Sequence, residues 1–221
     1  MSKTDHLRNV PIFTDLTDSD LTKIASNMVP RVYEKGQMIL LEESMGETFF
    51  IITQGAVKVT RLSADGREVI LAMLGESDFF GEMSLLDGEG RSANIVANEY
   101  AKVLTLSRSD FLDCLESYPK IAIALLEELA IRLRKSDQQI ESLSLSDSEH
   151  RIGITLIRLA GELGTIKQGH VTVKNLPYQQ DIANMAGTSR ETVSLEDKKL
   201  VRRKNRNLTI YNFDAFRRVF A

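Results

Sequence analysis

The chain has 221 residues, of which 43% are hydrophobic and 27% are charged, so it is long enough for two domains that each bury a core. No apolar run approaches the roughly 20 residues that a membrane helix needs, and the first residues lack the apolar core of a signal peptide. One cysteine, Cys114, excludes an internal disulfide and a cysteine-ligated cluster. We therefore expect a cytoplasmic protein without a membrane partner.

The net charge of −3 hides an asymmetry along the chain. Residues 1–149 hold 15 basic and 25 acidic residues, whereas residues 150–221 hold 13 basic and 6 acidic residues, a balance of +7. A basic segment of this kind indicates a polyanionic partner. The alternative is a locally basic surface that contacts nothing.

The N-terminal part begins with a helix and continues with short strands. Asp15–Ile24 has the pattern of a capped amphipathic helix. From about Arg31 to Leu106, β-rich runs alternate with glycine-containing turns, and Asp65-Gly66 is a strong hairpin signal. The expected strands are Met38–Leu41, Thr48–Thr53, Ala56–Arg61, Glu68–Leu74, Ala93–Ala97 and Ala101–Leu106. This spacing predicts an antiparallel sandwich or jelly roll.

The segment Phe80–Ala93 carries the most specific chemistry in the chain. A short helix starting at Gly81 would direct its backbone N–H groups at an anion. Arg91 offers a planar fork for a phosphate, and Ser92 adds a hydroxyl beside it. Glu82 would repel a phosphate, so its expected partner is a sugar hydroxyl. The segment therefore predicts a pocket for a small phosphorylated sugar compound, such as a cyclic nucleotide.

A long helix is expected after the strands. Between Ala122 and Leu143 a seam of mostly apolar residues alternates at steps of four and three, with Ser136 as its polar member. The seam predicts a parallel homodimer; the alternative is a helix packed on its own domain. The expected interface residues are Leu126, Leu129, Leu133, Ile140 and Leu143. Ser142–Asp147 interrupts the heptad and predicts a hinge, with Asp147 as the N-cap of the next helix.

The basic half contains the pattern of a helix-turn-helix at Pro177–Val193, where Gly187 permits the tight turn. The capping-box spacing of Thr188 and Glu191 predicts a second helix from Ser189. Arg190 can pair with guanine and Glu191 can accept from cytosine. Glu191 can equally be a helix cap, and Arg190 a solvated charge.

Leu200–Tyr211 has the pattern of two strands around a basic turn. Such a wing would neutralise DNA phosphates with Arg203, Lys204 and Arg206 and make DNA affinity depend on salt. Together with the helix-turn-helix, the expected DNA-binding residues are Gln180, Ser189, Arg190, Glu191, Thr192, Arg203, Lys204 and Arg206.

Three motifs make the whole chain resemble bacterial transcription regulators of the cyclic-AMP receptor protein and fumarate-nitrate regulator superfamily. They are Gly46–Ile52, Phe80–Ala93 and Thr188–Val193. The resemblance implies an α+β protein with an N-terminal antiparallel β-roll, a long dimerisation helix and a C-terminal winged helix-turn-helix. The implied boundaries are residues 1–115, 116–145 and 146–221.

By this resemblance, Gly81 and Glu82 hold a ribose, and Arg91 and Ser92 hold a cyclic phosphate. Arg132 is expected to pair with Glu82 across the pocket. The full set of implied ligand-binding residues is Gly81, Glu82, Met83, Arg91, Ser92, Arg132, Ser136 and Asp137. The partners that it implies are a pseudo-palindromic DNA operator, a second copy of the chain and RNA polymerase.

The chain departs from the family pattern at two places. Asp137 stands where a hydroxyl residue near the adenine is usual. It can accept from the adenine amino group, select another base or reject nucleotides, which leaves the effector open between cyclic AMP and another cyclic nucleotide. After Ser194 the recognition helix is about five residues short. Both flanking segments keep the family register, which favours residues missing from the printed sequence over a true deletion. A true deletion favours a second function, a cyclic-nucleotide-binding module with impaired or lost DNA binding.

Enzymatic activity is not expected. The sequence shows no metal-ligand cluster and no pairing of a nucleophile with a base. A single cysteine argues against an iron–sulfur sensor, and the absence of histidine from the strand-rich region argues against a haem sensor. We therefore expect no metal and no cofactor besides the effector.

Overall fold

The computed structural model describes residues 2–167, 169–190 and 201–220. The chain divides into two compact units, with the boundary between Arg134 and Lys135. No helix of the described residues is long and apolar enough to cross a membrane.

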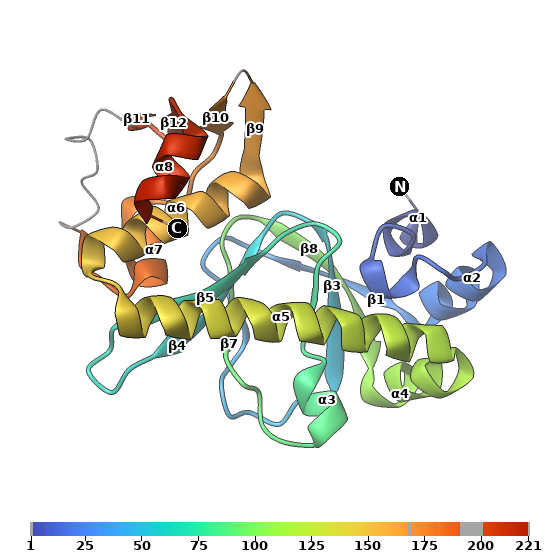
Figure 1. Cartoon of the computed structure of the whole chain (residues 1–221). Helices are drawn as coiled ribbons and strands as arrows, with labels where there is room; N and C mark the ends of the chain where they lie inside the picture. The colour runs from blue at the N-terminus through green and yellow to red at the C-terminus, as the bar shows by residue number, and fades with distance from the viewer. Residues whose placement is uncertain (1, 168, 191–200, 221) are drawn as a thin grey trace. The chain divides into compact units, whose positions relative to one another are not determined.

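The first unit contains an antiparallel β-roll and the helices that surround it (Figure 1). Its helices are α1 (Lys3–Leu7), the 3₁₀ helix η1 (Pro11–Phe13), α2 (Asp18–Asn27), α3 (Met83–Asp87), α4 (Arg108–Ser117) and the first part of α5 (Pro119–Leu145). Its strands are β1 (Val29–Tyr33), β2 (Met38–Leu40), β3 (Thr48–Gln54), β4 (Val57–Leu62), β5 (Glu68–Leu74), β6 (Phe79–Phe80), β7 (Asn94–Ala97) and β8 (Ala101–Ser107).

The roll consists of two sheets with the strand orders β1-β8-β3-β6 and β2-β7-β4-β5. All neighbouring strands pair antiparallel, as the sequence predicts. Each expected strand forms, and its ends agree with the prediction to within one residue. Strands β1 and β6 are not expected from the sequence. Pro30 argues against a strand in the sequence, but β1 lies at the edge of its sheet, where a proline is tolerated. Strand β6 has only two residues, too few to form a recognisable pattern.

Strand β3 connects the two layers of the core. Phe50 and Ile52 pack into a cluster shared with the second sheet, whereas Phe49 and Ile51 pack into a cluster shared with the helices. This explains why the strand has a continuous apolar run instead of alternation, since both of its faces are buried. Strand β6 pairs with β3, so the segment that follows β6 is anchored on a strand with both faces buried.

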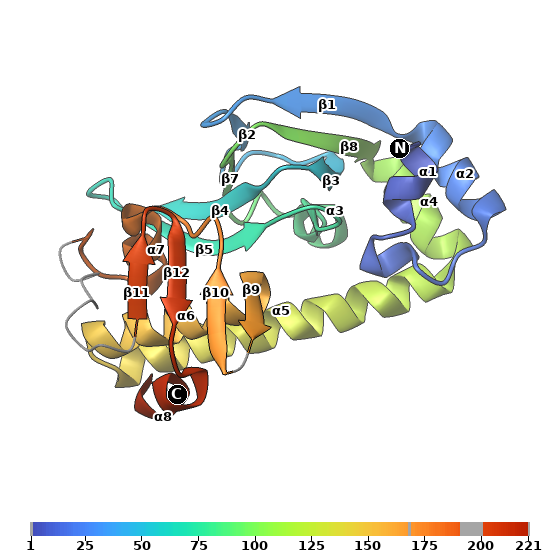
Figure 2. The same ribbon diagram turned by 90° about the horizontal axis from the view of Figure 1, so that it is seen from above.

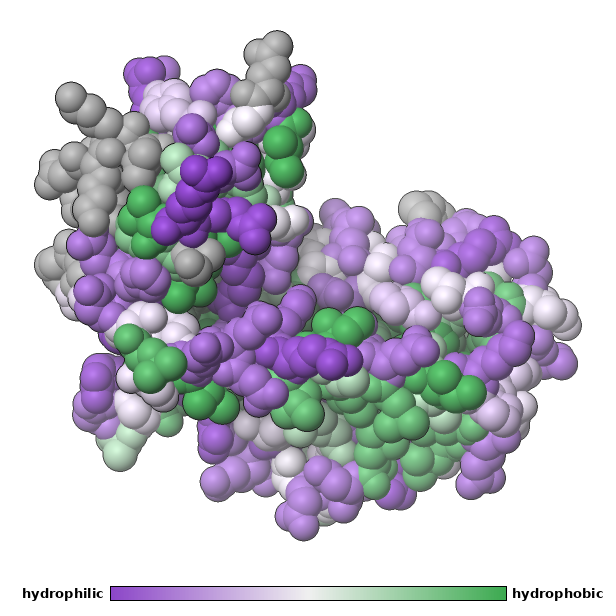
Figure 3. Space-filling model, viewed as in Figure 1, coloured by the Kyte–Doolittle hydropathy of each residue, from purple (hydrophilic) through white to green (hydrophobic). Residues whose placement is uncertain are grey.

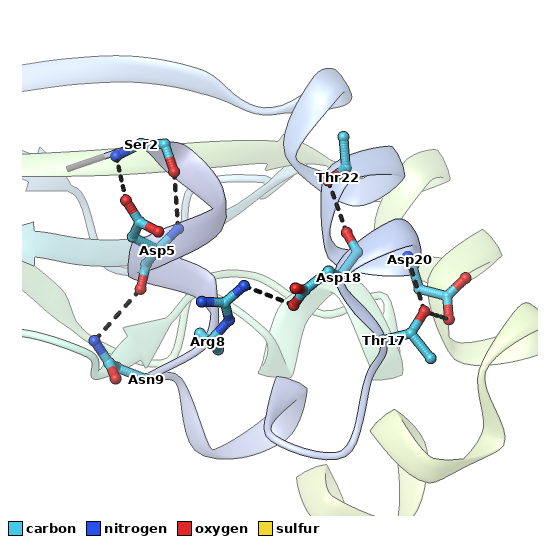
Figure 4. A network of polar contacts seen from close by, with 8 residues as sticks. All are labelled: Ser2, Asp5, Arg8, Asn9, Thr17, Asp18, Asp20 and Thr22. Atoms are coloured by element: carbon cyan, nitrogen blue, oxygen red, sulfur yellow. Dashed lines mark hydrogen bonds and ion pairs between the residues drawn. The ribbon is translucent and has the colours of Figure 1, made fainter.

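The N-terminal helices are held by capping contacts (Figure 4). Ser2 and Asp5 form a capping box at the start of α1, and the Thr17 hydroxyl accepts from Asp20 N at the start of α2. Arg8 joins the two helices through Asp18, at 2.6 Å. The expected capped helix is confirmed, although it begins at Asp18 and not at Asp15.

Two helix boundaries differ from the sequence-based expectation. Helix α3 begins at Met83 and not at Gly81, because Gly81 has a φ of +85°, which a helix does not allow. Helix α5 continues through Ser142 to Leu145, so the expected break at 142–147 is confined to two residues. Asp147 caps α6, as expected, with Oδ1 accepting from His150 N at 2.8 Å.

The second unit is a small domain built on a four-stranded antiparallel sheet of the order β11-β12-β10-β9 (Figure 2). Besides the end of α5, its elements are α6 (Ser148–Leu163), β9 (Gly164–Lys167), β10 (His170–Val173), α7 (Gln179–Ala186), β11 (Val201–Lys204), β12 (Asn207–Ile210) and α8 (Phe213–Phe220). The two expected wing strands are β11 and β12. The expected second helix of the helix-turn-helix falls mainly on residues 191–200, outside the described residues.

Arg151 of α6 binds the ends of two other helices in this unit. Its Nη1 donates to Ser146 O, directly after α5, at 2.9 Å. Its Nε and Nη2 donate to Ala186 O and Gly187 O, at the end of α7, at 2.9 and 3.2 Å. A guanidinium at two helix C-termini complements the partial negative charge of both dipoles. Arg151 thereby fixes α7 and its turn relative to the end of α5.

Candidate functional site

The candidate ligand site lies where two connections of the roll meet. Gly81 and Glu82 connect β6 to α3, and Arg91 and Ser92 connect α3 to β7. Gly81 is required by its positive φ and by space, because a Cβ there would lie 2.8 Å from Arg91 Nη1. The backbone of this turn therefore sits directly against the arginine.

Arg91 is buried, with 5% of its surface exposed. Its Nη1 donates to Gly81 O at 2.7 Å and to Ser84 Oγ at 2.8 Å, and its Nη2 donates to Thr48 O at 2.8 Å. Burial lowers the pKa of the guanidinium, whereas the charges of Glu82 and Glu47 raise it. Helix α3 starts at Met83 and is only five residues long, so the helix start expected at Gly81, with its N–H groups directed at an anion, does not form.

Glu82 is 3% exposed and forms the expected ion pair with Arg132 of α5, with 3.1 Å between Oε1 and Nη1. Arg132 is itself fixed, because Nη2 donates to Phe79 O at 2.9 Å and the guanidinium lies 4.4 Å from the centre of the Phe79 ring. Burial raises the pKa of Glu82, and the charge of Arg132 opposes that shift. Among the buried side-chain oxygen and nitrogen atoms described, only Glu82 Oε2 has no hydrogen-bond partner.

Ser92 and Met83 are exposed and lie together beside these buried groups. The Ser92 hydroxyl donates to Met83 Sδ at 3.6 Å. The structure thus brings together six of the expected ligand residues in the first unit. Ser136 and Asp137 belong to the second unit and are exposed, and their contact with a base stays a prediction.

Four of the expected DNA-binding residues lie at exposed positions in or near α7 and the wing. Gln180 of α7 is exposed and donates to Asn184 Oδ1 at 2.9 Å. Ser189, Arg190 and Lys204 are also exposed. Glu191, Thr192 and the side chain of Arg203 lie outside the described residues. The roles of all these residues remain predictions.

Arg206 makes contacts that the sequence does not indicate. Its Nε donates to Leu176 O at 3.1 Å and its Nη2 donates to Asn175 O at 3.2 Å, while the guanidinium lies 4.9 Å from the centre of the Tyr178 ring. These contacts tie the wing to the segment before α7. Phosphate binding by Arg206 stays a prediction.

Most of the apolar residues expected to form the seam of α5 are exposed among the described residues. Leu126, Leu133, Ile140 and Leu143 are 67%, 63%, 61% and 54% exposed. Leu129 is partly buried against the core of the first unit. Figure 3 shows hydrophobic residues gathered beside α5 on the face where it passes α3 and α4. Apolar side chains exposed at this spacing are typical of an interface.

Two further residues contribute to these sites although the sequence analysis did not single them out. Ser84 accepts a hydrogen bond from Arg91, and apart from its place inside the Phe80–Ala93 motif no sequence pattern indicates this contact. No sequence pattern indicates the contacts of Arg151, because its three acceptors are backbone carbonyls that only the fold brings together.

Comparison with known proteins places both units in one family. Residues 30–118 match the cyclic nucleotide-binding domain, and residues 150–219 match the Crp-like helix-turn-helix domain. The cyclic AMP receptor protein of Thermus thermophilus is 34% identical over 188 residues, which cover 85% of this chain and 84% of that protein. A CRP-like cAMP-activated global transcriptional regulator of Mycobacterium tuberculosis is 30% identical over the same shares of the two chains.

Solved structures agree on the fold. A CooA mutant from Carboxydothermus hydrogenoformans superposes with a TM-score of 0.78 at 22% identity, over 89% of both chains. The c-di-GMP responsive global regulator CLP of Xanthomonas campestris gives a TM-score of 0.75 at 20% identity, over 89% of this chain and all of that one. The expected fold class is thus confirmed. The chain belongs to the cyclic-AMP receptor protein and fumarate-nitrate regulator family of DNA-binding transcription regulators, with a cyclic nucleotide-binding domain followed by a Crp-like helix-turn-helix domain.

Proposed function

We propose that the protein is a homodimeric regulator that binds cyclic AMP in the β-roll beside α5 and binds a pseudo-palindromic operator in response. The observation that carries the ligand site is Glu82 Oε2, a buried carboxylate oxygen without a partner. Such an atom is costly to bury. A sugar hydroxyl that donates to it would remove that cost and would leave the ion pair with Arg132 in place.

Arg91 supports a phosphate on the same ligand. Its three hydrogen bonds engage both N–H groups of Nη1 and one of Nη2. Of the five donors of a guanidinium, the Nε–H and the second N–H of Nη2 make no hydrogen bond to a described residue. A phosphate that accepts from both would sit on a cation held in place by the protein, which gives a strong, charge-assisted contact.

The choice of cyclic AMP rests on the relatives. The Thermus thermophilus protein is named for cyclic AMP, and the Mycobacterium tuberculosis protein is called cAMP-activated. Cyclic GMP and cyclic di-GMP are the competing effectors, because Asp137 departs from the family pattern on the base side and CLP, which shares the fold, is called c-di-GMP responsive.

Dimerisation and DNA binding complete the proposal. The exposed leucines of α5 would be covered by the same seam of a second copy, and two helix-turn-helix units would then meet two half-sites about one turn of DNA apart. In the dimer, the two α5 helices could adopt more than one arrangement. A ligand that binds one of these arrangements better than the others would shift the dimer toward that arrangement. The proposed location of the protein is the cytoplasm. RNA polymerase is its proposed further partner.

An electrophoretic mobility shift experiment tests this function. The protein is incubated with promoter fragments from its own genome, with and without cyclic AMP. A shift that requires cyclic AMP supports the proposal. Binding of cyclic AMP without any shift supports instead the second candidate, a nucleotide-binding module without DNA binding, which the short segment after Ser194 favours.

A further inference from the structure

We infer that Ser84 is a positioning residue for the effector phosphate, which it serves by fixing the guanidinium of Arg91. The inference rests on the proposed function, because it assigns Arg91 to the phosphate. Ser84 itself is not expected to touch the ligand. It is 4% exposed, and its hydroxyl accepts from Arg91 Nη1 at 2.8 Å.

The guanidinium lies in a tight socket. A Cβ on the buried Gly46 would lie 2.2 Å from Arg91 Nε and 2.6 Å from Ser84 Oγ, and a Cβ on Gly81 would lie 2.8 Å from Nη1. Two backbone carbonyls also accept from the guanidinium, Gly81 O from Nη1 and Thr48 O from Nη2. Ser84 provides the one side-chain acceptor that Arg91 uses in this socket among the described residues.

The hydroxyl determines which edge of the guanidinium is presented. With the Ser84 and Gly81 oxygens on Nη1, both donors of that nitrogen are satisfied, so the Nε–H and one Nη2–H are left for an anion. Without the hydroxyl, one Nη1–H would lose its acceptor in a buried site. The group would then have to turn or recruit water, and the phosphate would meet a less ordered cation.

The position of Ser84 on α3 argues for this role over helix stability. Serine is a poorer helix former than alanine, and α3 is anchored by Leu85, which is fully buried. Alanine would therefore suit the helix better. The hydroxyl is explained by Arg91.

The test uses three variants of the full chain and titration calorimetry with cyclic AMP. Ser84→Ala should weaken binding about 10-fold, close to 1.4 kcal/mol. Ser84→Cys, which keeps the shape and weakens the acceptor, should lose a similar factor. Ser84→Thr, which restores the hydroxyl, should recover most of it. The control Ser26→Ala removes a serine that bonds Lys23 O on its own helix α2, and should bind as the wild type.

A double-mutant cycle separates positioning from a structural effect. In an Arg91→Lys background, which keeps a cation for the phosphate but lacks the guanidinium that Ser84 fixes, Ser84→Ala should cause little further loss of cyclic AMP affinity. A full 10-fold loss in that background, or wild-type affinity for both Ser84→Ala and Ser84→Cys, would overturn the inference.

A ligand-independent readout keeps the inference distinct from the proposed function. In ¹⁵N NMR spectra of the ligand-free protein, the Arg91 guanidinium N–H signals should be resolved and slow to exchange, should broaden in Ser84→Ala, and should return in Ser84→Thr. If the wild type binds no cyclic nucleotide, the proposed function fails, while this pattern would still support Ser84 as the residue that positions Arg91. Identical Arg91 signals in wild type and Ser84→Ala would refute it.

Discussion

Glu82 and Arg132 join the β6–α3 connection to α5 through an ion pair of 3.1 Å between Oε1 and Nη1. The pair leaves Oε2 buried and without a partner. Arg132 is held in turn by the carbonyl and ring of Phe79. The ribose end of the proposed pocket is therefore built from the roll and from α5, the helix that carries the proposed dimer seam, so a ligand there would contact both elements.

The first prediction concerns the pH dependence of cyclic AMP binding. Burial raises the pKa of Glu82, and the charge of Arg132 opposes the shift. In the ligand-free protein the Glu82 carboxyl group therefore keeps its proton to a higher pH than an ordinary glutamate side chain does. A hydroxyl that donates to Oε2 favours the carboxylate, so binding should release a proton. Affinity should therefore rise as the pH increases through the raised pKa.

Calorimetry in buffers of different ionisation enthalpy measures that proton release. Glu82→Gln cannot lose a proton at this position, so it should bind more weakly and show a flatter pH profile. Equal slopes for wild type and Glu82→Gln would show that another group titrates.

The second prediction concerns the dimer. Leu133→Arg places a charge on the exposed seam of α5, and two such charges would face each other across the interface, so the variant should be a monomer. Gln138→Arg adds the same charge at an exposed position outside the seam and should remain a dimer. Light scattering coupled to size-exclusion chromatography measures both masses. If Leu133→Arg remained a dimer, the interface would not be formed by the seam of α5.

The third prediction concerns Arg151. Hydrogen bonds to charged groups are worth about 1.5–3 kcal/mol each and are not additive. Arg151→Ala, which removes three bonds to the ends of α5 and α7, should destabilise the second unit by roughly 3 kcal/mol.

Hydrogen exchange should show this loss as faster exchange at the amides of α7 and of the start of α6, with little change in the roll. Lys174→Ala, at an exposed position of the same unit, is the control and should exchange as the wild type does. Unchanged hydrogen exchange in α7 of Arg151→Ala would mean that the three hydrogen bonds of Arg151 contribute little to the stability of the second unit.

The fourth prediction concerns reading of the operator. Arg190→Ala should weaken operator binding by about 1–3 kcal/mol with less effect on scrambled DNA, because an arginine that pairs with guanine discriminates between bases. Arg217→Ala removes the same charge from an exposed position on α8 and should leave the ratio of the two affinities unchanged. Fluorescence anisotropy gives both affinities. An equal loss on operator and scrambled DNA would assign Arg190 to the phosphates.

The sequence predicts most strands of the roll because they are β-rich runs, most of them flanked by glycine-containing turns. It predicts the ligand motif because most residues of that motif are close together along the chain. Strand β1 escapes prediction, since its exposed residues and Pro30 make sense only at the edge beside β8. The start of α3 is mispredicted because a glycine turn and a helix start look alike until the φ of Gly81 is known.

Contacts between distant segments are the part of the site that local sequence patterns do not supply. The Glu82–Arg132 pair can be expected only from the family resemblance, as the two residues are 50 positions apart. The bond between Arg91 and Thr48 O spans 43 positions and ends on a backbone carbonyl. No residue type marks such an acceptor, so the socket around Arg91 becomes apparent only in the folded chain.

The proposed role of Arg91 is to hold the phosphate of a cyclic nucleotide. Titration calorimetry of wild type and Arg91→Ala with cyclic AMP, cyclic GMP and cyclic di-GMP measures that role, with circular dichroism to confirm that the variant is folded. The wild type should bind cyclic AMP most tightly, and folded Arg91→Ala should show no measurable heat of binding. Equal affinity of the two proteins for cyclic AMP, or no binding of any of the three ligands by the wild type, would contradict the proposed role.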